Sequence, residues 1–355
     1  MNNEKKITVC IIGCGRIFKR HFSAINDNSN KFDLVAICDK NLDKTQNLQL
    51  DKNIKKFQNY VEMVASVNPD MVSVLVDSGS HYQIVKELIG KVKVLVVEKP
   101  FTLKLSQTDE LVEMAKKTKT SLFVVKQNRY NLPVLAAENA LALGRFGKLL
   151  LGTIRVRWSR HQPYYDQAKW RGTWWGDGGV ITNQASHHLD LLLKFMGPAK
   201  RVSAIAKTHL ADIETEDTLV ALIEFENGAV GTIEATTATR PSDLEGSISI
   251  LGSKGTVEIG GFAVNKLQTW KFDEEIEEDK YTIKNASENP PDVYGFGHQR
   301  YYEALYDVIE SGLVSSFPSA EESRKSLELI HAIYKSVEIS GFVELPLKEE
   351  FDRLG

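Results

Sequence analysis

The chain has 355 residues, a length that favours two domains, and 42% of them are hydrophobic, enough to fill a large core. Its 44 basic and 47 acidic residues leave a formal net charge of −3, which argues against a protein that binds nucleic acid through a clustered basic face. No apolar run approaches the ~20 residues that a membrane-spanning helix requires, so we expect neither nucleic acid nor membrane as a partner.

The chain holds three cysteines, Cys10, Cys14 and Cys38, all in or beside expected buried strands. An odd count without metal-ligand spacing argues against a disulfide framework and against a zinc site. The first residues lack the apolar stretch of a signal peptide. We therefore expect a cytoplasmic protein with reduced thiols and no bound metal.

The first third of the chain alternates short apolar runs with amphipathic stretches. Runs that are apolar on both faces are typical of strands buried in a parallel sheet. The pattern predicts right-handed βαβ units and a doubly wound α/β domain over residues 1–125. The expected strands are Ile7–Ile12, Phe32–Cys38, Met71–Val76, Val92–Val97 and Leu122–Val125, and the clearest helices are Tyr82–Ile89 and Ser106–Lys117.

The first strand runs into the turn Gly13-Cys14-Gly15, which a helix follows. The first glycine permits the tight turn, and the second lets the main chain approach a pyrophosphate at the helix N-terminus. Phe18 stands where the dinucleotide-binding fingerprint has a small third residue, so the turn alone predicts only a nucleotide-binding fold. Asp39, at the end of the second strand, can accept hydrogen bonds from a ribose 2′-hydroxyl and would repel a 2′-phosphate. We therefore favour NAD over NADP, with a helix N-cap as the alternative role for Asp39.

Glu98-Lys99-Pro100 follows the strand Val92–Val97. Open parallel sheets bind ligands at the carboxyl ends of their strands, so Lys99 is expected to face that crevice. A partly desolvated lysine beside a nicotinamide suits proton transfer near neutral pH. A strand-end lysine that reaches solvent explains the pattern equally well.

Residues 126–355 predict a different, α+β domain with a mainly antiparallel sheet and helices on one face. Asn227-Gly228 indicates a hairpin because both residues tolerate positive φ, Lys254-Gly255 indicates a second turn, and the acidic run 273–279 is interpreted as a solvated loop rather than an interaction tail. The expected strands are Leu149–Trp158, Arg201–Lys207, Asp217–Phe225, Ala229–Thr239, Ser247–Leu251 and Thr256–Ile259, and the expected helices are Leu132–Leu143, Val180–Phe195, His298–Glu310 and Ala320–Ile339.

The expected helix over residues 180–195 carries a second polar cluster. Asn183 and His187 are four residues apart and would share one helix face. Asp190 comes three residues later, close enough to support the imidazole of His187 and set its tautomer. His188 would point about 100° away, so the two adjacent histidines are not expected to share a metal ion. For His187 alone, a hydrogen-bonded core histidine is the simpler explanation.

Together, the glycine turn, Glu98-Lys99-Pro100 and the Asn183-x-x-x-His187-x-x-Asp190 pattern resemble the glucose–fructose oxidoreductase / inositol dehydrogenase (Gfo/Idh/MocA) family over nearly the whole chain. That family usually has Asp at the position of Asn183. The resemblance implies an NAD-binding Rossmann domain (residues 1–125) and a substrate-binding and oligomerisation domain with a large open sheet (residues 126–355). It also implies catalytic roles for Lys99 and His187 and a homodimer or homotetramer packed through the C-terminal sheet.

Further segments are similar to the subgroup of this family that acts on UDP-N-acetylglucosaminuronate, which has Asn at the position of Asn183. The similarity implies NAD-dependent oxidation of the sugar C3 hydroxyl, in biosynthesis of the diamino uronic acids of surface polysaccharides such as lipopolysaccharide. The alternatives are another sugar or inositol dehydrogenase of the family and a non-catalytic NAD-sensing protein. The segments are Gln127–Asn131, Tyr164–Trp174, Asn183–His187, Glu216–Thr218, Leu244–Ser247 and Tyr294–His298.

Under this hypothesis the UDP-sugar is the substrate, and Lys99, helped by His187, takes the hydroxyl proton. A substrate with a diphosphate and a carboxylate needs cationic partners. The aromatic candidates, Trp174 included, fit core packing equally well. The expected cofactor-binding residues are Gly13, Gly15, Arg16, Ile17, Asp39, Ser78, His81, Glu98, Lys99 and Gln127, and the expected substrate-binding residues are Lys99, Arg129, Arg157, Tyr164, Tyr165, Trp170, Arg171, Asn183 and His187.

Overall fold

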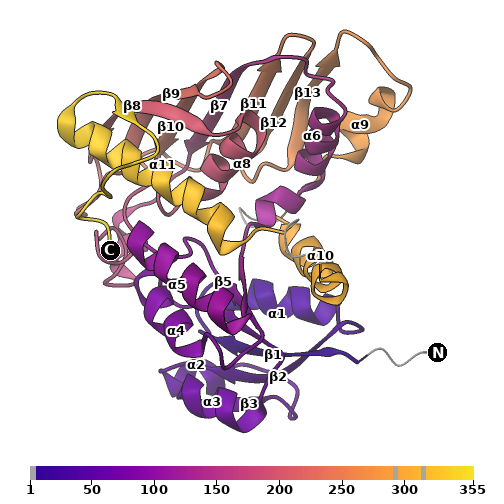
Figure 1. Cartoon of the computed structure of the whole chain (residues 1–355), viewed down its shortest axis with the longest axis vertical. Coiled ribbons are helices and arrows are strands. Elements are labelled where there is room, and N and C mark those ends of the chain that lie inside the picture. The colour runs from indigo at the N-terminus through magenta and orange to yellow at the C-terminus, as the bar shows by residue number, and fades with distance from the viewer. Residues whose placement is uncertain (1–4, 291–294, 313–316) are drawn as a thin grey trace. The chain divides into compact units, whose positions relative to one another are not determined.

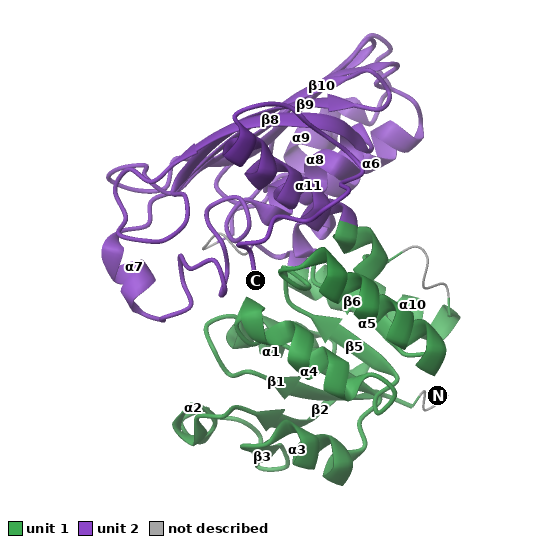
Figure 2. Ribbon diagram, turned by 60° about the vertical axis from the view of Figure 1, so that its left-hand side comes forward, with its two compact units in different colours: residues 1–125, 298–324 green, residues 126–297, 325–355 purple. Residues whose placement is uncertain are grey.

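The computed structural model describes residues 5–290, 295–312 and 317–355, and the chain divides into two compact units. Unit 1 comprises residues 1–125 and 298–324, and unit 2 comprises residues 126–297 and 325–355 (Figure 2). The sequence predicts a single division at residue 125, so the return of the chain to unit 1 is a finding of the structure. Tyr294, in one of the segments that carry the subgroup resemblance, lies outside the described residues.

Unit 1 is built on a sheet of six parallel strands in the order β3-β2-β1-β4-β5-β6. This is the strand order of a Rossmann sheet, and it confirms the predicted fold class of the N-terminal part. Figure 1 labels β1, β2, β3 and β5 of this sheet. β1 and β2 have the predicted bounds, whereas the short edge strand β3 has no apolar run that would predict it. The strands are β1 (Ile7–Ile12), β2 (Phe32–Cys38), β3 (Lys55–Phe57), β4 (Met71–Val74), β5 (Val94–Val97) and β6 (Ser121–Val124).

Helices cover both faces of this sheet. Alternate strand residues such as Cys10, Val72 and Leu95 share one apolar core with α3, α4 and α5. The opposite face carries α1 and α10, where the hydroxyl of Tyr302 lies 3.1 Å from that of Ser73 on β4. The helices are α1 (Phe18–Asp27), α2 (Leu42–Gln46), α3 (Tyr60–Val67), α4 (His81–Leu88), α5 (Leu105–Thr118) and α10 (Gly297–Ser311).

The returning segment, residues 298–324, completes the core of unit 1. Tyr302 packs edge-on against Phe32 with 5.7 Å between ring centroids, and Phe317 packs edge-on against Phe123 at 5.2 Å. The main-chain N–H of Val124, in the last strand, donates to the carbonyl oxygen of Pro318 at 3.0 Å. Because buried aromatic rings contribute a large share of core energetics, unit 1 depends on a segment far downstream in the chain.

Unit 2 contains a sheet of eight strands in the order β13-β12-β11-β7-β10-β9-β8-β14. All neighbouring pairs are antiparallel except β7 and β10, which run parallel, so the predicted, mainly antiparallel sheet is confirmed. The two edge strands, β13 and β14, are additions to the predicted set. The strands are β7 (Leu149–Arg157), β8 (Ala199–Lys207), β9 (Thr218–Phe225), β10 (Val230–Thr236), β11 (Glu245–Gly252), β12 (Gly255–Gly260), β13 (Lys266–Phe272) and β14 (Val343–Glu344).

Helices lie on one face of this sheet. α8 packs so closely on β7 that a Cβ atom at Gly152 would lie 2.6 Å from the side chain of Met196. Apolar side chains such as Ile205, Val220 and Leu222 are exposed on the sheet. Within the described part of the chain, no helix has the length and apolar character needed to cross a membrane. The helices are α6 (Leu132–Ala142), α7 (Gln162–Asp166), α8 (Ser186–Met196), α9 (Asp279–Asn285) and α11 (Ala320–Ile339), which begins in unit 1.

The hairpin predicted at Asn227-Gly228 joins β9 and β10. Gly228 has a φ of +84°, and its N–H donates to the carbonyl oxygen of Phe225 at 3.0 Å. Asn227 is not among the residues with positive φ, so the turn needs that conformation only at the glycine. The turn predicted at Lys254-Gly255 is also present, between β11 and β12.

Candidate active site

The turn after β1 constrains its two glycines differently. Gly13 has a φ of +100°, and a Cβ atom there would lie 2.6 Å from the carbonyl oxygen of Leu75. The fold itself therefore excludes a side chain at Gly13. At Gly15 a Cβ atom would meet none of the described atoms within 4 Å. This open side is where the main chain of such a turn can approach a pyrophosphate.

The helix after this turn has no side-chain cap among the described residues. α1 begins at Phe18, and its N-cap residue, Ile17, makes no capping side-chain hydrogen bond within the described chain. Arg16, in the turn, is exposed. Anions bind at such helix ends because the N–H groups point at the ligand and the helix dipole favours negative charge. Phe18 is buried and stacks on Phe22 at 5.7 Å, so packing accommodates a large residue at the third fingerprint position.

Asp39 links the end of β2 to the glycine turn. One carboxylate oxygen accepts the main-chain N–H of Cys14 at 2.8 Å, and the other accepts that of Asn41 at 2.9 Å. The N-cap alternative for Asp39 is wrong, because Asn41 caps α2 by accepting the N–H of Asp43 at 3.0 Å. The open side of Gly15, the uncapped α1 and a carboxylate at the end of β2 together fit the NAD site of this fold.

Two further residues expected to bind the cofactor follow β4. Ser78 begins a short 3₁₀ turn and is half-buried. His81 is 0% exposed, and its Nδ1 and Nε2 lie 2.8 Å and 3.2 Å from the carbonyl oxygens of Pro100 and Val76. Burial lowers the pKa of His81. His81 therefore ties the loop after β4 to the loop after β5, and its side chain presents no surface to a ligand.

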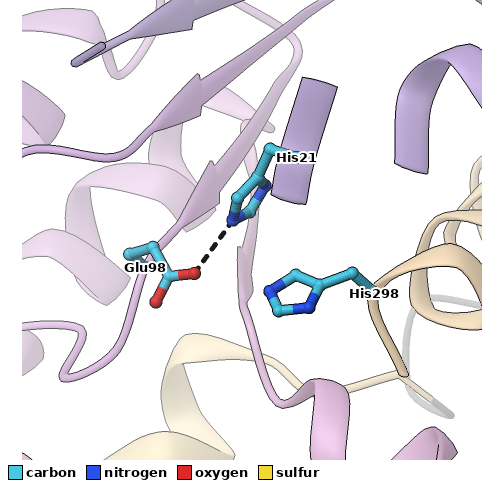
Figure 3. Close-up of side chains that lie close together, drawn as sticks. All are labelled: His21, Glu98 and His298. Carbon is cyan, nitrogen blue, oxygen red and sulfur yellow. Dashed lines mark hydrogen bonds and ion pairs between the residues drawn. The ribbon is translucent and has the colours of Figure 1, made fainter. Parts of the chain in front are cut away.

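Lys99 follows β5 and is half-buried, at the carboxyl end of a parallel strand. The carboxylate of Glu98, which is buried, accepts the main-chain N–H of Lys99 at 3.0 Å and lies 2.9 Å from Nε2 of His21. The side chain of His298 lies close to the same pair (Figure 3). Burial alone would raise the pKa of Glu98, but the hydrogen bond from His21 and the positive charges around it lower that pKa to about 2. Glu98 is thus a buried anion next to Lys99.

The second polar cluster, in unit 2, does not lie on one helix. α8 begins at Ser186, so the helix predicted over residues 180–185 is wrong. The N–H of Val180 donates to the carbonyl oxygen of Glu216 at 3.0 Å, and the N–H of Ile181 donates to the Glu216 carboxylate at 3.1 Å. The segment keeps single i→i−4 bonds, from the N–H of Asn183 to Gly179 and from that of Gln184 to Val180, but forms turns and no regular helix. Asn183 therefore precedes α8, which carries His187.

Glu216 anchors this irregular segment. Burial raises the pKa of Glu216 to about 7. The hydroxyl of Tyr334 donates to one carboxylate oxygen at 3.1 Å, and a Cβ atom at Gly179 would collide with the carboxylate. Gly179 therefore leaves room for a buried carboxyl group that holds the main chain at Val180 and Ile181.

Asn183 and His187 each contact another part of unit 2. The amide of Asn183 donates to the carboxylate of Asp177, which also accepts the N–H of Gly172 at 2.8 Å. The side-chain amide nitrogen of Gln127 lies 3.1 Å from Nε2 of His187. Gln127, expected at the cofactor, thus contacts the imidazole expected to be catalytic.

Asp190, expected to support His187, lies between two cations. Nε and Nη2 of Arg129 donate to its two carboxylate oxygens at 2.6 Å and 2.7 Å, and Nζ of Lys126 lies 3.2 Å from one of them. Burial would raise the pKa of Asp190, but these cations hold it well below its usual range. Arg129, expected to bind substrate, therefore neutralises a buried carboxylate of this chain.

Arg157 is likewise paired with carboxylates. Its Nε and Nη2 each lie 2.6 Å from an oxygen of Glu234, and Nη1 lies 2.9 Å from Glu245. All three side chains stand on neighbouring strands, β7, β10 and β11. The guanidinium is therefore saturated by its own sheet.

Arg171 differs, because no carboxylate of the described residues pairs with it. Its Nη1 donates to the carbonyl oxygen of Tyr164 at 2.8 Å, and its guanidinium carbon lies 4.1 Å from the Tyr164 ring centroid and 5.3 Å from that of Trp170. Gln184 donates to the Tyr164 hydroxyl at 3.3 Å. A guanidinium framed by two aromatic rings can bind an anion and stack against a planar group.

Tyr165 and Trp174 are packing residues. The Tyr165 hydroxyl lies 2.9 Å from that of Thr237 in the interior of unit 2, and burial raises the pKa of Tyr165 to about 12. Trp174 packs against Tyr334 and Phe351 at 5.1 Å and 5.4 Å. Both fit the core-packing alternative.

The structure adds four polar residues to these sites to which sequence reasoning gives no role, although Glu216 and His298 stand in segments that carry the subgroup resemblance. His21 lies on the buried stripe of α1 that includes Phe18 and Ile25, and a polar residue in such a stripe is the available signal. His298, Glu216 and Asp177 carry no periodic signal, because their partners lie far away in the sequence.

Comparison with known proteins finds one family model for the N-terminal part of the chain and another for the C-terminal part. Residues 7–126 match the model of an oxidoreductase family with an NAD-binding Rossmann fold, and residues 134–258 match that of the GFO/IDH/MocA C-terminal domain. The myo-inositol 2-dehydrogenase of Thermotoga maritima is 24% identical over 346 residues, which cover 94% of this chain and 97% of that protein.

Two solved structures are more similar. The WlbA dehydrogenase from Bordetella pertussis, in complex with NADH and UDP-GlcNAcA, is 38% identical with a TM-score of 0.90, over 98% of this chain and 99% of its own. The WlbA dehydrogenase from Chromobacterium violaceum, in complex with the same two ligands, is 36% identical with a TM-score of 0.89, over 98% of each chain.

Proposed function

We propose that this chain, which belongs to the GFO/IDH/MocA family of oxidoreductases with an NAD-binding Rossmann fold, oxidises the C3 hydroxyl of UDP-N-acetylglucosaminuronate to the 3-keto sugar. The observation that carries the proposal is the full-length similarity to two dehydrogenases whose structures hold NADH and UDP-GlcNAcA. The Asn183 position, which departs from the broad family pattern, supports the same choice.

The NAD cofactor is held at the turn after β1. The main chain at Gly15 and the N–H groups at the start of α1 would hold the pyrophosphate, and Asp39 would accept hydrogen bonds from the ribose hydroxyls. When bound, the cofactor supplies the acceptor for the hydride that leaves the sugar carbon.

Lys99 takes the proton of the sugar hydroxyl. It stands at the carboxyl end of a parallel strand, where ligands of this fold bind. His187 is assigned a supporting role, and its contact with Gln127 at 3.1 Å orients the imidazole. A general base of this kind typically contributes ~10²–10⁴-fold in rate.

Arg171 is the cation assigned to the anionic groups of the substrate. Arg129 and Arg157 already bind carboxylates of this chain, whereas Arg171 has aromatic and carbonyl neighbours among the described residues. Trp170 and Tyr164 beside it offer a stacking surface and a hydroxyl group.

The test compares UDP-N-acetylglucosaminuronate with free N-acetylglucosamine and myo-inositol by the absorbance of reduced nicotinamide. We expect turnover of the UDP-sugar alone, and we expect Lys99→Met to bind NADH normally while turnover falls at least ~10²-fold. Near-normal turnover by this variant would remove Lys99 from the mechanism. Turnover of inositol or free sugar in place of the nucleotide sugar would favour another dehydrogenase activity of the family, and NAD binding without any turnover would favour an NAD sensor.

The proposal extends to assembly and pathway. Exposed apolar side chains on the eight-stranded sheet suit packing against a second copy of the chain, so we expect a homodimer or homotetramer, measured by light scattering. The 3-keto product suits an aminotransferase, as required for diamino uronic acids of surface polysaccharide made in the cytoplasm.

A further inference from the structure

Three buried titratable side chains meet in the interior of unit 1 (Figure 3). His21 comes from α1, Glu98 follows β5, and His298 comes from α10. Their exposed fractions are 0%, 8% and 4%. The proposed reaction uses none of the three directly, yet Glu98 is the residue before Lys99.

Hydrogen bonds fix both oxygens of the Glu98 carboxylate. One lies 2.9 Å from Nε2 of His21, and the other accepts the main-chain N–H of Lys99 at 3.0 Å. The other ring nitrogen of His21 lies 2.8 Å from the hydroxyl of Tyr302, which in turn lies 3.1 Å from the hydroxyl of Ser73. A continuous chain of contacts therefore runs from the middle of β4 to the main chain of Lys99.

His298 closes the other side of the cluster. Its ring lies edge-on to that of His21, with 5.2 Å between centroids, and neither ring nitrogen has a hydrogen-bond partner among the described residues. Burial, together with His21, lowers the pKa of His298 to about 3, so this ring is neutral near neutral pH. It lies beside Glu98 in the interior of unit 1.

The titratable groups that interact with Glu98 among the described residues come from several elements of unit 1. They are His21 on α1, His298 and Tyr302 on α10, His81 on α4 and Lys99 itself. Lys99 is the only amine among them, and its charge contributes to keeping Glu98 ionised. The interaction is reciprocal, because a carboxylate that is stabilised by an ammonium group stabilises that ammonium group equally.

We propose that His21, Tyr302 and His298 hold Glu98 as a buried carboxylate behind Lys99, and that this charge sets the pH at which Lys99 becomes a base. The inference rests on the proposed role of Lys99 in proton transfer. Glu98, His21 and His298 are positioning residues, and no proton passes through them. In a site of low dielectric constant, removal of one adjacent charge changes the basicity of an amine strongly.

The test measures the basicity of Lys99 directly in the full chain, so that it depends on no substrate. Trace acetylation modifies only the free amine, and mass spectrometry of the Lys99 peptide across a pH series gives the midpoint of its titration. We expect Glu98→Gln, which keeps the side-chain shape, to move this midpoint at least one pH unit lower, which is at least a tenfold gain in free amine below the midpoint. His298→Asn, which replaces the ring beside the carboxylate with a smaller polar side chain, is expected to fall between wild type and Glu98→Gln.

Glu113→Gln is the matched control, because it removes the same charge from an exposed position on α5 and is expected to leave the midpoint unchanged. A cooperative urea unfolding transition of each variant confirms that it is folded. An unchanged midpoint in folded Glu98→Gln would overturn the proposal, as would one tightly bound metal ion per chain that is lost in His298→Asn. The proposed function fails separately, if wild type does not turn over UDP-N-acetylglucosaminuronate.

Discussion

Gly13 and Gly15 stand two residues apart in one turn, yet different constraints act on them. Gly13 has a positive φ, and a side chain there would also collide with the main chain of Leu75. At Gly15 the same atom would meet none of the described atoms within 4 Å. The first glycine is therefore a requirement of the fold, and under the proposed function the second is a requirement of the cofactor.

This difference predicts opposite outcomes for the two alanine variants. We expect Gly15→Ala to keep the free energy of unfolding of wild type and to lose at least about tenfold in NADH affinity, because its methyl group occupies the approach of the pyrophosphate. Gly13→Ala is expected to lose at least ~1 kcal/mol of stability from its backbone conformation alone. Urea unfolding and NADH fluorescence titration measure the two quantities. Normal NADH affinity in Gly15→Ala would refute the assignment of the turn.

The different partners of two arginines in unit 2 predict different effects of their replacement on the KM for the UDP-sugar. We expect Arg171→Met to raise the KM for the UDP-sugar about 10–100-fold with little change in kcat, because a hydrogen bond to a charged group contributes ~1.5–3 kcal/mol. Arg201→Met serves as the control, since Arg201 pairs with Glu224 at 2.6 Å on an exposed part of the sheet. Equal KM values for the two variants would show that another group binds the diphosphate or carboxylate.

The sequence pattern predicts a helix or strand well where the residues that stabilise it are close in the sequence. β1 and β2 were predictable to the residue because each is an apolar run next to a polar turn, and α11 because its apolar positions repeat at helical spacing. The segment 180–185 has the same apolar composition as α8 but bonds to Glu216, about 35 residues away. The glycine turn, Lys99 and His187 could be named from sequence, whereas the ion pairing that separates Arg171 from Arg129 and Arg157 could not, because it depends on tertiary neighbours.

The anchoring of this segment predicts a pH dependence of stability. The pKa of Glu216 is about 7 in the folded chain, against 4.5 for a glutamate exposed to solvent, so folding takes up a proton between these pH values. The free energy of unfolding therefore falls by about 3 kcal/mol as the pH rises through the 2.5 units from 4.5 to about 7. Above that range this contribution no longer changes with pH. Glu216→Gln stays neutral, so its stability relative to wild type is expected to increase from pH 5 to pH 8. Urea unfolding of both proteins at both pH values measures this difference, and a pH-independent difference would contradict it.

At the scale of the whole molecule, unit 1 is assembled from two distant parts of the chain. Tyr302 packs against Phe32, and Phe317 packs against Phe123. The hydroxyl of Tyr302 also contacts the imidazole of His21. Sequence pattern does not predict this return, because the helix over residues 297–311 has the same amphipathic character whichever unit it covers.

A fragment that ends at residue 125 is therefore expected to lack a complete core. We expect residues 1–125 alone to show no cooperative thermal transition by circular dichroism, and residues 1–125 joined to 298–324 by a flexible linker to regain one. The reason is the loss of buried aromatic area, which dominates core energetics. Cooperative melting and NADH binding by the shorter fragment would contradict the role assigned to the returning segment.

The same return sets the order of events during synthesis. The Rossmann sheet leaves the ribosome first, but Phe317 follows Val125 by about 190 residues, which takes roughly 10–40 s at typical elongation rates. Throughout that interval one face of the nascent sheet lacks its aromatic cover and exposes Phe32 and Phe123. The cofactor-binding half of this enzyme is therefore the first to be made and among the last to be finished, so its apolar face needs protection from aggregation, such as a chaperone provides, until the C-terminal helices emerge.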